Sequence, residues 1–271
     1  MSKTTTEHDD AGKSSQPRVI LVAITKHGVK QLAALAERMP NAHILVSEKF
    51  SDLLRAESNC NLDARIQSYN GALRTEIPLL FRNYDQIVFF VSLGAVVRLI
   101  APHIKSKDED PGVIVVDDAA QFVIPVLSGH VGGANAYAEQ VANLIGATPV
   151  VTTASDVGKT IPVDILGREL GWTVEAPKIN ITRVSAHVVN EEPIAFVQDA
   201  GSTNWWTRPT PLPGNIELFE RFDQVDLDRH KAILWVTHAT IPENTWSLLS
   251  ERLVVYRPPI ETSPAKTGET A

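Results

Sequence analysis

The sequence has a single cysteine, Cys60, among its 271 residues, so no disulfide can form within the chain. A lone thiol excludes a cysteine-rich zinc module and fits a reducing compartment. We expect Cys60 to be a small, partly buried side chain and not a nucleophile, because free cysteine usually packs like a small hydrophobic residue. Histidine and acidic residues share no recognisable ligand spacing, so we also predict no metal site.

Runs of basic residues are missing as well. The formal net charge is −7 and the isoelectric point lies near 5.6. Nucleic acids are bound through a basic face, so we exclude them as partners. Lys105 and Lys107 precede three acidic residues, and such a mixed run is usually a solvated loop.

Long apolar runs are the third absence. The most apolar stretch, residues 87–101, is interrupted by Ser92, Gly94 and Arg98. It is shorter than the roughly 20 residues that a membrane-spanning helix needs. Residues 1–16 are polar and lack the apolar core of a secretory signal peptide. We therefore predict a cytoplasmic protein without a membrane partner.

The composition that is present belongs to a folded globular protein. Hydrophobic residues make up 44% and charged residues 21% of the chain, which is long enough to bury a sizeable core without disulfides. At roughly 100–200 residues per domain, it forms one large domain or two small ones. We predict disordered tails at 1–16 and 258–271, an N-terminal α/β domain at 17–158 and a central α/β domain at 159–257.

Strands and helices alternate along the first of these domains. Residues 19–24 and 87–91 are continuous apolar runs, typical of strands buried on both faces. The alternation predicts a mainly parallel sheet with helices on both faces, a Rossmann-like fold, followed by a smaller α/β domain. The predicted strands are 19–24, 43–46, 87–91, 113–116, 122–127, 149–151, 193–197 and 232–237. The predicted helices are 28–38, 71–84, 94–104, 134–145, 162–170 and 179–189.

Three polar segments follow predicted strands: 92–94, 128–135 and 152–156. In open parallel sheets, ligands bind beyond the carboxyl ends of the strands. The second segment is the most informative, because a buried strand ends at Leu127, three glycines follow and a helix then begins. Glycine lets a backbone approach a ligand closely, and N–H groups at a helix start favour an anion. The alternative interpretation is a tight strand–helix turn with a capping serine.

Familiar nucleotide and hydrolase motifs do not fit this glycine-rich segment. Its glycines do not give the dinucleotide fingerprint G-x-G-x-x-G, and Ser128 lacks the flanking glycines of the G-x-S-x-G elbow. The later run Gly158-Lys159-Thr160 is no phosphate-binding loop, because Thr153 stands where the upstream glycine is required. A nucleotide-dependent oxidoreductase is therefore disfavoured.

Five further side chains allow two interpretations each. Arg98 is either a surface arginine or an anion clamp beside a helix start. Asp117 and Asp118 end a predicted strand, where a carboxylate can act as a general base or form a turn. Trp205 and Trp206 could stack on a flat ligand, but we favour a packing role in the core or a loop.

Four segments are distinctive when they are read together. They are LGAVVRLIAP at 93–102, KSK at 105–107 with DPGVIVVD at 110–117, VLSGHVGGAN at 126–135, and VVTTASD at 150–156. The run L-S-G-H-x-G-G-A-N, followed by T-T-A-x-D, resembles the cobalt-precorrin-5A hydrolase family (CbiG) and is highly specific to it. The similarity covers about 17–257, is strongest at 87–165 and is looser in the second half.

The resemblance implies a step of anaerobic cobalamin biosynthesis. The substrate is a cobalt corrinoid that carries a δ-lactone on ring A. The family opens this lactone with water and expels the former meso carbon as acetaldehyde, which gives cobalt-precorrin-5B. Because cobalt arrives inside the substrate, we expect no cofactor of the protein's own.

Roles for individual residues follow from that chemistry. Lactone opening needs an activated water and stabilisation of an oxyanion. We expect His130 to be the base or proton shuttle, with Ser128 and Asp156 as its catalytic partners. The amides of Gly132 and Gly133 would face the oxyanion. The expected substrate-binding residues are Gly94, Arg98, Lys107, Gly129, Gly132, Gly133, Asn135, Thr152 and Thr153.

Family members usually carry a third, C-terminal domain, and we expect this domain to be absent from the present chain. In the family that domain is sometimes a separate chain, or it is fused to a corrin methyltransferase. We therefore expect a partner chain to supply it. The competing interpretation is a non-catalytic subunit that holds the corrinoid and needs the separate domain for activity.

Overall fold

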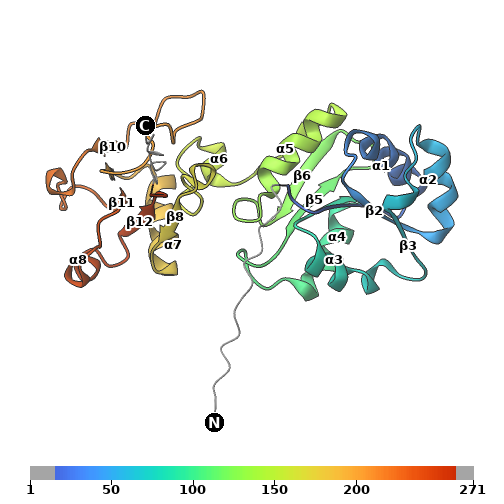
Figure 1. The fold of residues 1–271 in the computed structure, drawn as a ribbon, viewed down its shortest axis with the longest axis horizontal. Helices are drawn as coiled ribbons and strands as arrows, with labels where there is room; N and C mark the ends of the chain where they lie inside the picture. The colour runs from blue at the N-terminus through green and yellow to red at the C-terminus, as the bar shows by residue number, and fades with distance from the viewer. Residues whose placement is uncertain (1–15, 261–271) are drawn as a thin grey trace, which may run out of the picture. The chain divides into compact units, whose positions relative to one another are not determined.

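The computed structural model describes residues 16–260 and forms two compact units (Figure 1). The first unit ends at Val151 and the second begins at Thr152, earlier in the chain than the predicted boundary at 158. The predicted tails over 1–15 and 261–271 lie outside the described residues. Within residues 16–260, no helix is long and apolar enough to cross a membrane.

A seven-stranded sheet lies at the centre of the first unit, in the order β3-β2-β1-β4-β5-β6-β7. Strands β1 to β5 run parallel, β6 is antiparallel to β5, and β7 is parallel to β6. The mainly parallel sheet is therefore confirmed. The strands are β1 (Val19–Ala23), β2 (His43–Ser47), β3 (Ile66–Tyr69), β4 (Gln86–Phe90), β5 (Gly112–Val116), β6 (Phe122–Leu127) and β7 (Thr148–Pro149).

Helices cover both faces of this sheet, as predicted. One face packs against α1 (Lys26–Arg38), α2 (Ser51–Glu57) and α5 (Ala134–Ile145) through side chains such as Leu32, Leu54 and Val141. The other face packs against α3 (Ile77–Asn83) and α4 (Leu93–Ile100) through Ile77 and Val96. All five of these side chains have 0% exposure, and each contributes about 1.5–3 kcal/mol of transfer free energy.

Several elements of the first unit differ from their predicted bounds. The predicted helix 71–84 is a 3₁₀ turn at Leu73–Thr75 followed by α3, because Pro78 is tolerated only in the first turn of a helix. The predicted helix 94–104 ends its α-helical part at Ile100 and continues as a 3₁₀ turn at Ala101–His103. Strand β3 and helix α2 were not predicted.

The second unit is built on a five-stranded sheet in the order β10-β9-β11-β12-β8. Strands β9 to β12 are parallel, and β8 is antiparallel to β12. Helix α7 packs on one face, and α8 lies by the smaller core of the other. The elements are α6 (Ala154–Val157), β8 (Thr173–Glu175), α7 (Lys178–Val189), β9 (Ile194–Gln198), β10 (Ile216–Phe219), β11 (Ala232–Val236), α8 (Glu243–Leu248) and β12 (Leu253–Arg257).

The helix predicted at 162–170 is wrong. This segment consists of turns and a 3₁₀ helix at Arg168–Leu170. Gly167 and Gly171 flank that short helix in the left-handed region, with φ of 71° and 75°. A side chain at Gly167 would collide with the Trp172 ring. The segment therefore folds around the tryptophan instead of continuing as a helix.

Candidate active site

The glycine-rich segment forms a loop, residues 128–133, that connects β6 to α5; we call it the glycine loop. Because β6 is antiparallel to β5, Leu127 at its end pairs with Val113 at the start of β5. The glycine loop therefore lies at the edge where the parallel strands begin. Residues 92–94 follow the carboxyl end of β4 and lie at the opposite edge. The expectation that both segments share one edge is wrong.

Close packing explains the glycines of this loop. The amide of Gln86, at the start of β4, donates from Nε2 to the carbonyl oxygen of Gly132 at 2.5 Å. A Cβ at Gly132 would collide with Ser128 and lie 2.8 Å from its carbonyl oxygen. A Cβ at Gly129 would lie 2.6 Å from Oδ1 of Asn135. Both Cβ contacts are shorter than real Cβ atoms make. At Gly132 the obstacle is the backbone of Ser128, so only glycine fits, whereas at Gly129 a side chain would displace the amide of Asn135.

The N–H groups at the start of α5 donate hydrogen bonds to carbonyl groups of the glycine loop itself. Gly133 donates to the carbonyl of His130 at 2.9 Å, Ala134 to that of Ser128 at 3.2 Å, and Asn135 to that of Gly129 at 3.0 Å. The predicted anion site on these amides, with Gly133 as an oxyanion donor, is therefore wrong for this conformation. The alternative interpretation, a tight strand–helix turn, describes the backbone of the loop. The serine hydroxyl does not cap the helix, because main-chain carbonyls accept the N–H groups at its start.

Ser128 is the strained member of the loop. Its φ is 54°, in the left-handed region that a residue with a side chain adopts only at a cost of about 1–2 kcal/mol. The residue is 8% exposed, and its Oγ has no hydrogen-bond partner among the described residues. A buried hydroxyl without a partner costs about 1–3 kcal/mol more. Such unfavourable features concentrate at functional sites.

Gln86 is a polar residue of this site that the sequence analysis missed. Its side chain is 5% exposed, and Oε1 has no partner within residues 16–260. A Cβ at Gly112, its neighbour on β5, would lie 2.8 Å from Cδ of Gln86, so glycine at this position lets the glutamine side chain keep its place. The available signal was a glutamine at the start of an otherwise apolar strand.

The other predicted binding residues of the first unit lie apart from the glycine loop or are exposed. Nη1 of Arg98 donates to the carbonyl of Gly94 at 2.8 Å, so the guanidinium folds back on its own helix at the opposite edge. Lys107 is exposed in the loop that leads into β5, at the same edge as the glycine loop. The nearby Asp110 fixes that loop by accepting the backbone N–H of Lys105.

Asp156, Thr152 and Thr153 belong to the second unit. Thr153 precedes the single turn of α6, which contains Asp156. Oδ1 of Asp156 accepts a hydrogen bond from Nη2 of Arg208 at 2.9 Å. Both side chains are about three-quarters buried, at 27% and 26% exposure. No motif in the sequence pointed to Arg208, so this ion pair is a second feature that the sequence analysis missed.

Three earlier alternatives are settled by contacts. The carboxylate of Asp117 accepts N–H groups of residues 119, 121 and 122, so it forms the β5–β6 turn. Trp205 stacks on Phe196 with ring centroids 4.2 Å apart, which confirms the packing role. Cys60 is exposed, so the expectation of a partly buried thiol is wrong.

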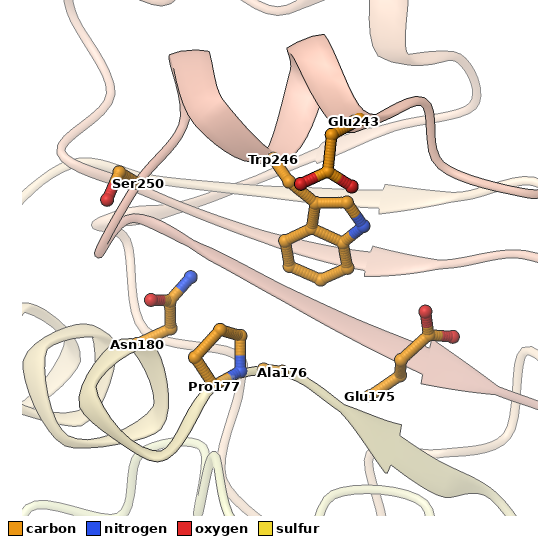
Figure 2. Close-up of a pocket in the computed structure, with 7 residues that line it drawn as sticks. All are labelled: Glu175, Ala176, Pro177, Asn180, Glu243, Trp246 and Ser250. Carbon is orange, nitrogen blue, oxygen red and sulfur yellow. The ribbon is translucent and has the colours of Figure 1, made fainter.

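Polar cavities elsewhere offer no metal centre. Within residues 16–260, no group of three or more histidine, cysteine or acidic side chains could hold a metal ion. A cavity of about 440 Å³ lies between α7 and α8, with Trp246 facing Glu175 and Glu243 (Figure 2). Two polar side chains of its lining already have partners within the protein. Glu175 forms an ion pair with Arg257, and the side-chain amide of Asn180 donates to the carbonyl of Leu253 and accepts the N–H of Glu251.

Two family models match this chain. The model for the N-terminal region of the cobalamin synthesis G proteins matches residues 76–156, and the model for the central region of these cobalamin biosynthesis proteins matches 161–258. The chain belongs to the cobalamin synthesis G family. The resemblance carried by the glycine loop and the residues around it is thereby confirmed.

Individual relatives of the family extend this result. The chain is 43% identical over 240 residues to the cobalt-precorrin-5A hydrolase of Priestia megaterium. The aligned region covers 89% of this chain and 62% of that protein. It is 30% identical over 209 residues to the cobalt-precorrin-5A hydrolase of Salmonella typhimurium, covering 77% and 52%. A solved cobalamin biosynthesis protein G homolog from Sulfolobus solfataricus has a TM-score of 0.48 at 21% identity, over 89% of this chain and 60% of its own. The chain spans about three-fifths of the length of the first relative.

Proposed function

We propose that this chain acts as a cobalt-precorrin-5A hydrolase of cobalamin biosynthesis. The observation that carries the proposal is the 43% identity, over 89% of the chain, to a relative of that name. The reaction would open the ring A δ-lactone with water and release acetaldehyde, which leaves cobalt-precorrin-5B. Cobalt is part of the substrate, so no cofactor enters the proposal. We place this reaction in the cytoplasm, without a nucleic-acid or membrane partner.

The glycine loop supports a specific division of roles in this reaction. His130 takes the proton of the attacking water as the new C–O bond forms at the lactone carbonyl. The unpartnered hydroxyl of Ser128 donates to the oxyanion, because the Gly133 amide is bonded to His130. Collapse of the oxyanion breaks the ring C–O bond, and the proton taken up by His130 passes to the oxygen that leaves. The freed hydroxyl then gives up that proton, the C–C bond to the macrocycle breaks as acetaldehyde leaves, and the electron pair of that bond stays with the macrocycle.

Asp156 acts in this proposal by positioning a second residue, Arg208. Its ion pair with Arg208 holds the guanidinium in one orientation, and a guanidinium presents paired donors that match a carboxylate. The substrate carries several carboxylates at its rim. We propose that Asp156 positions Arg208 for one of them, with Thr152 and Thr153 as neighbouring binding residues. Gly94, Arg98 and Lys107 stay candidate contacts of the same substrate.

Acetaldehyde release from cobalt-precorrin-5A by the purified chain tests the proposal. We expect His130→Ala and Ser128→Ala to lower the turnover by about 10²-fold or more, since base and oxyanion contributions have that size. The matched control is His27→Ala, an exposed histidine of α1. Full turnover in both loop variants would contradict the assigned roles.

The same assay separates the enzyme from a carrier. It is run with and without the separately supplied C-terminal domain of a full-length relative. Release only with the added domain would support the proposed partner chain. Bound pigment without release in either mixture would favour the corrinoid-binding subunit and contradict the hydrolase proposal.

A further inference from the structure

Two adjoining cavities lie at the carboxyl ends of the parallel strands of the second unit. Their volumes are about 640 and 480 Å³, within the size range of small-molecule sites. Thr203 lines both. Residues that follow β9, β11 and β12 line the first, and residues of β9 and β10 with the loop between them line the second. This edge is where open parallel sheets bind ligands.

The first cavity displays His238 on a fixed piece of backbone. Nη1 of Arg257 donates to the carbonyl oxygens of Thr237 and Ala239, at 2.9 and 2.5 Å. The N–H of Ala239 donates to Oγ1 of Thr237 at 3.0 Å. His238 lies between these two residues, is exposed and lines the cavity beside Ser202. Its backbone is held on both sides while its imidazole stays available to a ligand.

The second cavity has an aromatic wall that Gln198 organises. Nε2 of Gln198 donates to the carbonyls of Ala200 and Ser202 at 3.0 and 2.9 Å, and its Oε1 accepts from Nε1 of Trp205 at 3.0 Å. Trp206 meets Trp205 edge-on, with centroids 6.1 Å apart. One glutamine at the end of β9 therefore shapes both the polar loop of the first cavity and the aromatic wall of the second.

An apolar side chain beside this wall is left in the solvent. Leu218 of β10 lines the second cavity and is 61% exposed. Aromatic rings and an exposed leucine suit a flat, largely apolar surface. The hydroxyls of Ser202 and Thr203 and the imidazole of His238 suit a polar rim beside it. A ligand that fills both cavities is therefore broad, flat and edged with hydrogen-bonding groups.

We propose that this carboxyl edge of the second sheet binds the cobalt corrinoid through its own contacts, separately from the glycine loop. The ring system lies along Trp206 and Leu218, and its rim carboxylates meet Ser202 and His238. The identity of the ligand rests on the proposed function. The existence of a binding site rests on the two cavities and the loops that shape them.

Hydrogen exchange of the full chain with cobyrinic acid, a cobalt corrinoid with free rim carboxylates, tests the location. We expect exchange to slow at residues 199–206 and 237–239 when the corrinoid is added. No slowing there, or slowing confined to 128–135, would overturn the proposal. Slowing that depends on protein concentration without corrinoid would assign the edge to a second copy of the chain and would also overturn it.

Variants give a second measurement of the same site. We expect His238→Ala with Trp206→Phe to weaken cobyrinic acid binding about tenfold or more by calorimetry, as expected for lost aromatic and hydrogen-bond contacts. The matched controls His27→Ala and Trp246→Phe, the latter in the cavity between α7 and α8, should bind unchanged (Figure 2). Equal affinity in variant and control would contradict the site, provided that all variants unfold at similar urea concentrations.

The two proposals can fail separately. Corrinoid protection at this edge without acetaldehyde release would leave the site standing and refute the hydrolase. Acetaldehyde release with unchanged exchange at 199–206 and 237–239 would refute the site and leave the hydrolase standing.

Discussion

Nε2 of Gln86 lies 2.5 Å from the carbonyl oxygen of Gly132, and this bond ties the start of β4 to the glycine loop. The loop follows β6, which is two strands away from β4 in the sheet. The buried amide of Gln86 therefore reaches past β5, the strand between β4 and β6, to contact the glycine loop. The bond makes the loop a part of the sheet's core, so its geometry is tied to the stability of the first unit.

Replacing Gln86 tests that coupling. Gln86→Leu leaves the Gly132 carbonyl without its donor, and we expect it to lower the free energy of unfolding by about 1–3 kcal/mol, as for other buried groups left unpaired. Urea unfolding measures the change. Gln140→Leu, on the exposed side of α5, is the control and should alter it by less than about 0.5 kcal/mol. Equal effects in both variants would show that the amide bond contributes nothing specific.

Gly132 in the glycine loop and Gly214 in the second unit differ sharply in the space around them. In Gly132→Ala the new methyl collides with Ser128, so we expect a loss of about 1–3 kcal/mol, typical of overpacking. Gly214→Ala is the matched control, because no atom lies within 4 Å of the position of its Cβ. Thermal unfolding of both variants measures the difference. A Gly132 variant as stable as the control would mean that the loop rearranges freely.

Much of this fold can be predicted from local sequence. The strands at 19–24 and 87–91 are apolar along their whole length because both of their faces are covered, and α5 begins and ends at the predicted residues. The direction of β6 was missed, although a signal existed. Residues 117–121 alone connect β5 to β6, and a parallel crossover needs about a dozen residues or more. That short connection requires an antiparallel pair and moves the glycine loop to the other edge.

Contacts between distant parts of the chain were beyond the same reasoning. Asp156 and Arg208 are separated by 52 positions, and no local pattern relates a one-turn helix to a proline-rich loop. Gln86 and Gly132 are 46 positions apart. In both cases the pairing is decided by how strands and loops pack, which sequence periodicity does not describe.

We expect substitution of Ser128 to raise the stability of the first unit and to lower its activity. Ser128→Gly relieves the positive φ and removes the unpartnered hydroxyl, so we expect the free energy of unfolding to rise by about 1 kcal/mol after the entropy cost of glycine. Ser128→Ala keeps the backbone strain, so its free energy of unfolding should rise by less. Both variants should lose acetaldehyde release. Urea unfolding and the release assay measure the two effects, and a destabilised glycine variant would contradict the strain argument.

The Asp156–Arg208 ion pair should be worth more than the exposed pairs of the same unit. A double-mutant cycle with Asp156→Asn and Arg208→Gln should give a coupling of about 1 kcal/mol, the upper end for pairs that keep some solvent contact. The control cycle is Arg221 with Asp223, which are 70% and 61% exposed and should show no measurable coupling. Equal couplings in the two cycles would show that burial of Asp156 and Arg208 does not strengthen their interaction.

Tyr137 gives the first unit a dependence on alkaline pH. Burial against the core raises the pKa of its phenol to about 12 from the ordinary value of 10.0. The unfolded chain therefore releases this proton first, so the stabilisation is complete below pH 10 and is lost as the pH rises from 10 towards 12. Tyr137→Phe should therefore flatten the fall of the urea midpoint as the pH rises from 10.0 to about 12. An equally steep fall in Tyr137→Phe and in the unaltered chain would contradict the assignment.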